Sequence, residues 1–257
     1  MSEKIIDINV DIGEGYGRYE IGNDEEIIKW ATSANVAAGF HAGDPNTIAR
    51  TVKYAKKYGV AVGVHPSFQD LRGFGRRVIN ISGEDLKNDL LYQIGAVDGF
   101  VRKEGMELQH VKLHGALYTL ANENDEYAEV FSELINEYNA ELIVITEHNT
   151  TLERKCKEKG IRVANEAFPD LNYDKEGKIV IEKVKKTWDP VTVAKRAIKI
   201  AKEDIIVSET NVELHPNAET ICIHSDAPNS AEIIKTVRES LEKNGIKCSN
   251  LRAHKVA

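Results

Sequence analysis

Short apolar runs alternate with amphipathic stretches along almost the whole chain, and this alternation restricts the fold more than any other feature. We expect strands at eight runs: 5–12, 34–38, 60–65, 109–114, 141–146, 162–165, 204–207 and 220–224. Between most of them the apolar residues recur with helical spacing, as at Leu86, Leu90 and Ile94 in the stretch 84–104. Strands that alternate with helices form parallel sheets with right-handed crossovers. The chain is therefore predicted to be an α/β protein.

Two of these runs carry polar side chains on one face only. Carboxylate, amide, amine and imidazole groups alternate with apolar residues in both: Asp7, Asn9 and Asp11 in the first run, and His110, Lys112 and His114 in the fourth. Successive side chains of a strand point to opposite faces, so each polar set shares one face. A half-exposed strand would give the same pattern, but its return in a second strand favours polar groups that face inward around a reaction site.

Polar residues recur at the ends of so many strands that we prefer a closed TIM-type barrel of seven or eight strands, somewhat irregular, to an open doubly wound sheet. An open sheet would concentrate such residues at one switch point. With 42% hydrophobic residues and no break in composition, residues 1–257 are expected to form one domain. The region 170–188 is less regular. A turn at 174–177 followed by Ile179, Val180 and Ile181 predicts an inserted hairpin or lid there.

Charge and cysteine content exclude several classes of protein. The net charge is −7, from 34 basic and 41 acidic residues that are scattered along the chain, so we expect no nucleic-acid or anionic-lipid partner. The three cysteines lack CxxC spacing and the first residues lack an apolar signal run, which predicts a cytoplasmic protein. No apolar run approaches the ~18 residues of a membrane span.

Candidate catalytic residues follow the predicted strands, at the ends that a barrel gathers around one mouth. They are carboxylates, imidazoles and one amine: Asp11, Glu14, His41, His65, Lys112, His114, Glu209 and Asp226. Asp11, His41 and His65 could together hold a divalent metal ion and leave positions open for water and substrate. Without a metal, one group would act as general base for a water and another as acid for the leaving nitrogen. The residues alone leave both mechanisms open.

These candidates also have structural interpretations. A histidine at a strand end is often a hydrogen-bonded support, which applies to His65 before Pro66. Asp7 and Asn9 could satisfy neighbouring backbone groups in the same way. Lys112 is costly to bury unless a carboxylate or a substrate anion meets it, which favours a functional role.

Two glycine-rich segments follow predicted strands. The segment 13–17 matches neither GxGxxG nor a Walker sequence, and its glycines instead allow a tight turn past the mouth. The segment 72–77 places three arginines within six residues. Such a loop is suited to clamping a carboxylate or phosphate, so Arg72 and Arg76 are candidate cofactor-binding residues, although a solvated loop would show the same pattern.

Six ordered motifs carry a family resemblance: DINVDIGEG at 7–15, SANVAAGFHAGD at 33–44, HPS at 65–67, GFGR at 73–76, YQIGA at 92–96 and HVKLHGALY at 110–118. Together they resemble the LamB/YcsF family over nearly the whole chain. The resemblance implies an irregular TIM-type barrel related to sugar deacetylases and glycoside hydrolases, and hence to carbohydrate metabolism. It also implies the activity of the A subunit of bacterial 5-oxoprolinase, which opens 5-oxoproline to glutamate with ATP hydrolysis alongside two further subunits.

The chain departs from the family pattern mainly in its C-terminal half. The family's Lys-Pro-His-Gly is Lys-Leu-His-Gly at 112–115, which keeps the polar groups. Leu171 stands where the family pattern has an arginine, and the family's Pro-Arg pair is missing around 181–182. Gly-Glu-Trp is Ser-Glu-Thr at 208–210, and His-Gly-Asp is His-Ser-Asp at 224–226. Fewer cations should weaken the binding of an anionic ligand on that side of the mouth, by roughly 1 kcal/mol or more for each charged hydrogen bond.

The residues and the resemblance together imply a mechanism. ATP would activate the amide carbonyl, Asp11 or Glu14 would activate a water, and His41 and His65 would hold that water or a metal. Lys112 and His114 would stabilise the oxyanion, with Glu209 and Asp226 completing the mouth. Whether ATP binds this chain or a partner subunit is left open. Two alternatives are a metal-dependent deacetylase or amidohydrolase without ATP, and a non-catalytic subunit that binds a lactam or sugar.

Overall fold

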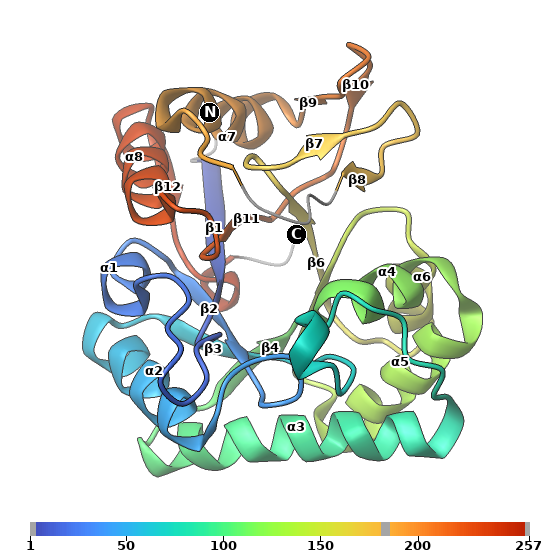
Figure 1. Ribbon diagram of the computed structural model, residues 1–257. Coiled ribbons are helices and arrows are strands. Elements are labelled where there is room, and N and C mark those ends of the chain that lie inside the picture. Colours follow the sequence, from blue (N-terminus) through green and yellow to red (C-terminus); the bar gives the residue numbers. More distant parts are fainter. Residues whose placement is uncertain (1–3, 181–185, 255–257) are drawn as a thin grey trace.

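The strands of the chain close into a barrel with helices outside it (Figure 1). The structure is a computed structural model that describes residues 4–180 and 186–254. The barrel strands are parallel and follow chain order: β1 (Lys4–Ile12), β2 (Ser33–Ala37), β3 (Ala61–His65), β4 (Leu108–Val111), β5 (Ile143–Thr146), β6 (Val163–Ala167) and β11 (Thr220–His224). β11 pairs with β1 from Asp7 opposite Thr220 to Asp11 opposite His224, which closes the ring. The predicted TIM-type barrel is thus confirmed, with seven strands.

The strand register brings the predicted polar ends to one level. Asp11 of β1 lies opposite Asn35 of β2 on one side and His224 of β11 on the other. On the next pair, Ala37 of β2 lies opposite His65 of β3. Residues far apart in the sequence therefore meet at the carboxyl ends of the strands, where barrel enzymes place their chemistry.

Eight helices and two short 3₁₀ turns are present in the described part of the chain: α1 (Asp24–Ile28), α2 (Pro45–Tyr58), η1 (Leu71–Gly73), α3 (Gly83–Lys103), α4 (Gly115–Glu123), α5 (Asp125–Asn139), α6 (Thr151–Glu158), α7 (Pro190–Glu203), α8 (Ser230–Lys243) and η2 (Leu251–Ala253). The apolar stripe of α3, which includes Leu86, Leu90 and Ile94, is buried as its spacing predicts. The apolar face of β1 is also buried, with Ile6, Ile8, Val10 and Ile12 at most 1% exposed. Apolar side chains thus fill the space between strands and helices, and polar ones are left to the barrel interior.

The predicted barrel strand at 204–207 is wrong. Ile206–Val207 forms β9, which pairs antiparallel with β10 (Glu213–Leu214) in a separate two-stranded sheet. Asp204 is the C-cap of α7 and has a left-handed conformation, so the extended segment that follows is short and only Ile206 and Val207 pair. Val207 is exposed, unlike a residue of the barrel wall. The wall position next to β6 is taken by β11 instead.

Two further elements surround the barrel. β7 (Asn172–Tyr173) and β8 (Ile179–Val180) pair antiparallel, which confirms the predicted hairpin, and the carboxylate of Asp174 accepts hydrogen bonds from the backbone of its turn. Ile181, which we expected to extend the second strand, lies outside the described residues, as do the positions around 182. β12 (Ile246–Cys248) was not anticipated and pairs with Lys4–Ile6, the part of β1 that reaches below the barrel. No helix in the described ranges is long and apolar enough to span a membrane.

Candidate active site

A buried ion cluster occupies the centre of the barrel. Lys112 lies just beyond β4, and its Nζ is 3.1 Å from a carboxylate oxygen of Asp11 and 3.0 Å from one of Glu166. The amine is 3% exposed and also donates to Asn9 Oδ1 and Cys222 Sγ. Burial alone would lower the pKa of Lys112, but Asp11 and its other partners raise the pKa well above its usual range. The lysine is therefore cationic and fixed.

Asp11 is held as a carboxylate by the groups around it. Its Oδ1 accepts from Asn35 Nδ2 at 2.7 Å as well as from Lys112, and its Oδ2 lies 3.4 Å from His65 Nε2. Burial would raise the pKa of Asp11, but His65 and Lys112 hold the pKa well below its usual range. A carboxylate of such low basicity anchors a site better than it accepts a proton.

Further polar side chains of the barrel interior support Asp11 and Lys112. Asn35 donates to Asn9 and lies 2.6 Å from His110 Nε2. Burial, together with Lys112, lowers the pKa of His110 to about 3, so its neutral ring donates to Asn35. A side chain at Gly63 would collide with that ring, which explains the glycine. Asp7 accepts from Thr32, Ser33 and Thr220, so it ties β1 to the beginnings of β2 and β11 and has a structural role.

His224 and Asp170 form a dyad on the opposite side of Asp11. The carboxylate of Asp170 accepts from the backbone N–H of His224 at 2.9 Å and lies 3.0 Å from its Nδ1. Nδ1 therefore carries the hydrogen, and Nε2 is directed toward Asp11 Oδ2, 3.9 Å away. The ring also stacks on Phe168, with 5.6 Å between ring centroids. This arrangement fixes an imidazole in one tautomer with its basic nitrogen facing the mouth.

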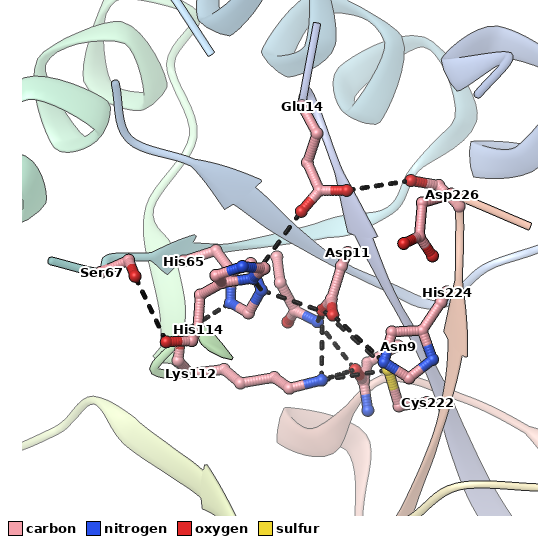
Figure 2. A network of polar contacts seen from close by, with 12 residues as sticks. Asn9, Asp11, Glu14, His65, Ser67, Lys112, His114, Cys222, His224 and Asp226 are labelled. Carbon is pink, nitrogen blue, oxygen red and sulfur yellow. Dashed lines mark hydrogen bonds and ion pairs between the residues drawn. The ribbon is translucent and has the colours of Figure 1, made fainter. Parts of the chain in front are cut away.

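Figure 2 shows His65, His114 and Glu14 on the side of Asp11 away from His224, and His41 belongs to the same group. The rings of His41 and His114 stack with centroids 3.8 Å apart, and His65 meets both edge-on. His41 Nε2 lies 3.5 Å from Glu14 Oε1. Burial, followed by the negative charges of Asp11 and Asp226, raises the pKa of Glu14 well above its usual range. Burial and the neighbouring imidazoles lower the pKa of His41, so its ring is neutral.

The arginine loop closes over these rings. Gly75 has a φ of 65°, and a Cβ there would lie 2.5 Å from Ser67 Oγ and 2.7 Å from the ring of His114. Arg76 pairs with Asp226 at 2.7 Å, while Arg77 pairs with Asp70 and holds the loop in place. Arg72 lies exposed on η1. Of the two predicted cofactor-binding arginines, only Arg76 lines the cavity.

The cavity at the mouth joins these groups. Its lining includes Asp11, His65, Lys112, His114 and His224, with Arg76 at its edge. Apolar residues complete it: Tyr118, Phe168, Leu171 and Ile179, the last from the β7–β8 hairpin. Fixed charge, a positioned imidazole and an apolar wall suit a small polar ligand such as an amide.

Most of the predicted site residues meet here. Asp11, Glu14, His41, His65, Lys112, His114 and Asp226 all belong to the network. Glu209 does not, because the strand before it is no barrel wall; it lies exposed and accepts from Asn172 of the hairpin. The predicted metal set is also divided. His41 and His65 group with Glu14 and His114, whereas Asp11 groups with Cys222 and His224.

Four residues that contact the central groups are not among the predicted catalytic residues: Glu166, Asp170, Cys222 and His224. The alternation of Thr220, Cys222 and His224 with Ile221 and Ile223 repeats the pattern of the first strand, and it could have pointed to Cys222 and His224. Asp170 lies in an irregular segment, where no periodicity indicates a direction.

Comparison with known proteins agrees with this architecture. A model of the LamB/YcsF family matches residues 6–256. The chain is 40% identical over 250 residues to the A subunit of 5-oxoprolinase from Natranaerobius thermophilus, covering 96% of this chain and 97% of the relative. It is 42% identical over 243 residues to that of Campylobacter jejuni, covering 94% and 95%.

Solved structures give the same result. The lactam utilization protein from Thermus thermophilus superposes with a TM-score of 0.89 at 39% identity, covering 95% of this chain and 98% of that one. A putative cellobiose-phosphate cleavage protein from Enterococcus faecalis, with a TM-score of 0.57 and 15% identity, shares the fold alone. Because the family model matches almost the whole length of the chain, the chain belongs to the LamB/YcsF family.

Proposed function

We propose that this chain is the hydrolytic A-type subunit of a 5-oxoprolinase and opens the lactam ring of 5-oxoproline to glutamate. The similarity to proteins named as the A subunit of 5-oxoprolinase and as a lactam utilization protein supports the substrate class. The observation that carries the proposal is the His224–Asp170 dyad, whose free ring nitrogen faces the cavity beside Asp11. Opening an amide needs such a group to move one proton from water to nitrogen.

In the proposed reaction His224 acts as general base and then as general acid. Its Nε2 takes a proton from the attacking water, and the same nitrogen returns the proton to the ring nitrogen as the C–N bond breaks. Asp170 keeps the imidazole in the required tautomer and stabilises its charged form. Asp11, which we expected to activate the water, already accepts from Asn35 and Lys112 and is better suited to orienting it.

The cations of the cavity are assigned to the substrate's oxygens. Arg76 lies at the edge of the cavity, where its guanidinium can exchange Asp226 for the carboxylate of 5-oxoproline in a two-point contact. Lys112 lines the same cavity and brings positive charge toward the oxyanion that forms when water adds. Tyr118 and Phe168 would cover the apolar edge of the ring.

ATP, when consumed by the assembled enzyme, would supply activation of the poorly electrophilic amide. This cavity does not suit a triphosphate, because the two cations of its lining, Arg76 and Lys112, are both assigned to the lactam. The carboxylates of Asp11, Glu166 and Asp226 beside them add negative charge that opposes a polyanion. In the loop at 13–17, the backbone N–H of Gly17 is bound by Asp44. We therefore assign ATP binding to partner subunits of the B and C type.

Reconstitution tests the proposal. The purified chain is incubated with candidate partner subunits, 5-oxoproline and ATP, and the release of glutamate and ADP is followed. We expect both products from the complete set and no glutamate when this chain is omitted. Glutamate formation at the same rate without the chain contradicts the proposal, and so does an intact complex that forms neither product.

A second candidate is amide hydrolysis without ATP, and the cluster of three imidazoles around Glu14 is the observation that favours it. Omitting ATP from the same incubation separates the two: ring opening at an unchanged rate would select the ATP-independent hydrolase. Tight lactam binding without turnover in any combination would select a binding subunit.

A further inference from the structure

Two histidine nitrogens of this cluster, His65 Nε2 and His114 Nδ1, face each other, and their other hydrogen bonds leave neither of them a hydrogen to donate. His65 Nδ1 lies 2.8 Å from the carbonyl oxygen of Lys112, and His114 Nε2 lies 2.9 Å from that of Phe74. A carbonyl oxygen only accepts, so each of these nitrogens carries its hydrogen. In neutral rings the remaining nitrogens, His65 Nε2 and His114 Nδ1, are then both acceptors, and they are 2.9 Å apart. Two lone pairs at this distance require a positive species beside them.

The same cluster holds buried polar atoms without hydrogen bonds. Neither ring nitrogen of His41 has a hydrogen-bond partner, although the residue is fully buried, and Glu14 Oε1 has none either. Unsatisfied buried groups cost free energy, so a native structure keeps few of them without a reason. The donor atoms of Glu14, His41, His65 and His114 all lie within 4.8 Å of one another.

We propose that Glu14, His41, His65 and His114 form a binding site for one divalent transition-metal ion of the zinc class. Three imidazoles and a carboxylate are typical ligands of such an ion, whereas Mg²⁺ and Ca²⁺ prefer oxygen. A tetrahedral ion with bonds of ~2.1 Å separates its ligand atoms by ~3.4 Å. The separations here are 2.9 Å between His65 and His114, 3.5 Å between His41 and Glu14, and 3.8 Å between His114 and Glu14.

The surroundings of the rings match those of metal ligands. Histidines that bind a metal usually donate their other N–H to a carbonyl or carboxylate, which fixes the ring. His65 and His114 do so through the backbone of Lys112 and Phe74, two residues that belong to different segments of the mouth. Gly75 packs against His41 and His114 and leaves no room for a side chain there.

The second group of potential ligands, Asp11, Cys222 and His224, lacks these features. Cys222 Sγ already accepts from Lys112 Nζ at 3.0 Å, and Asp11 accepts from Asn35 and Lys112. His224 is oriented by Asp170. Lys112 thus occupies Cys222 Sγ and Asp11 Oδ1, and its positive charge opposes a second cation beside them, so the metal site is assigned to the group around Glu14.

Metal titration tests the site without lactam, ATP or partner subunits, so its outcome is independent of the proposed reaction. The full chain is treated with a chelator and titrated with Zn²⁺ by calorimetry and with Co²⁺ by visible absorption. We expect one ion per chain and a rise in thermal unfolding temperature with Zn²⁺. His41→Asn and Glu14→Gln should each weaken binding more than ~100-fold, because even supporting groups are worth 10–100-fold. His215→Asn, at an exposed histidine, is the matched control and should bind as the wild type does.

Circular dichroism establishes that each variant is folded before titration, and either of the two ligand variants suffices if the other does not fold. Failure of the folded wild type to bind either ion overturns the proposal and leaves a shared proton between His65 and His114. Unchanged affinity in a folded ligand variant also overturns it, because the ion would then lie elsewhere.

Discussion

At the scale of single residues, buried charge organises the site. Lys112 lies between two carboxylates inside the barrel, and both of them are almost fully buried. Removing one partner of such a group leaves an uncompensated charge, which typically costs about 3–5 kcal/mol. The charge of Glu166 also acts on Glu147, which follows β5 and lies near Asn122.

Glu147 predicts a pH dependence of stability. Burial, followed by the charge of Glu166, raises the pKa of Glu147 to about 8. In the unfolded chain this carboxyl loses its proton near pH 4.5, so between that pH and about 8 the folded state binds more protons, and stability falls as pH rises. Glu147→Gln should remove this loss and gain on the order of a few kcal/mol over the wild type between pH 5 and 8.

Urea unfolding at several pH values measures the effect. Glu141→Gln, at an exposed residue near the other end of the same strand, is the control and should follow the wild type. Parallel stability curves for wild type and Glu147→Gln would contradict the predicted protonation of Glu147.

A residue's place in the site could be predicted from the sequence where the residue lies on or just after a regular strand. Asp11, His65, Lys112 and His114 belong to or directly follow strands with clear alternation, so their convergence could be predicted. Asp170 and Arg72 belong to irregular segments, where direction is set by tertiary contacts. Glu209 was predicted to lie at the mouth because it follows the run at 204–207, but that run pairs with β10 outside the barrel.

At the scale of elements, helix caps connect the loops of the mouth to the frame. Asp44 caps α2 by accepting from Asn46 and Thr47, and its second oxygen accepts from the backbone N–H of Gly17 at 3.0 Å. It therefore fixes the loop that follows Glu14. Asp189 caps α7 in the same Asp-Pro arrangement, but among the described residues its hydrogen bonds stay within its own helix start, through Thr192.

These two caps predict unequal effects of the same substitution. Asp189→Ala should cost ~1 kcal/mol of unfolding free energy, which is ordinary for a cap. Asp44→Ala should cost about 1 kcal/mol more, because the hydrogen bond to Gly17 is lost as well. Chemical denaturation of both variants measures the difference. Equal losses would mean that Asp44 does not stabilise the loop.

The elements themselves were largely predictable, since all seven barrel strands fall at runs expected from the sequence and most helices show clear periodicity. β9 was mistaken for a wall strand because its short apolar run gives no information on its pairing partner. β12 was missed because Ile246–Cys248 is too short to show alternation, and it pairs only because β1 reaches beyond the barrel.

At the scale of the whole molecule, closure between β11 and β1 places His224 beside Asp11 although 213 positions separate them. The catalytic proposal depends on this single contact between the first and last barrel strands. The mouth carries both the His224–Asp170 dyad and the imidazole cluster. Figure 2 shows Asp11 between His224 on one side and His65 and His114 on the other. The account therefore predicts that one cavity performs the chemistry.

The most direct test is the rate of glutamate release by the reconstituted enzyme with His224→Asn in place of the wild-type chain. We expect kcat to fall by roughly 10²–10⁴, the usual contribution of a general acid–base group, with circular dichroism unchanged. His215→Asn should retain the wild-type rate. A folded His224→Asn chain that supports glutamate release within about 3-fold of the wild type would contradict the account, because the proton transfer would then occur elsewhere.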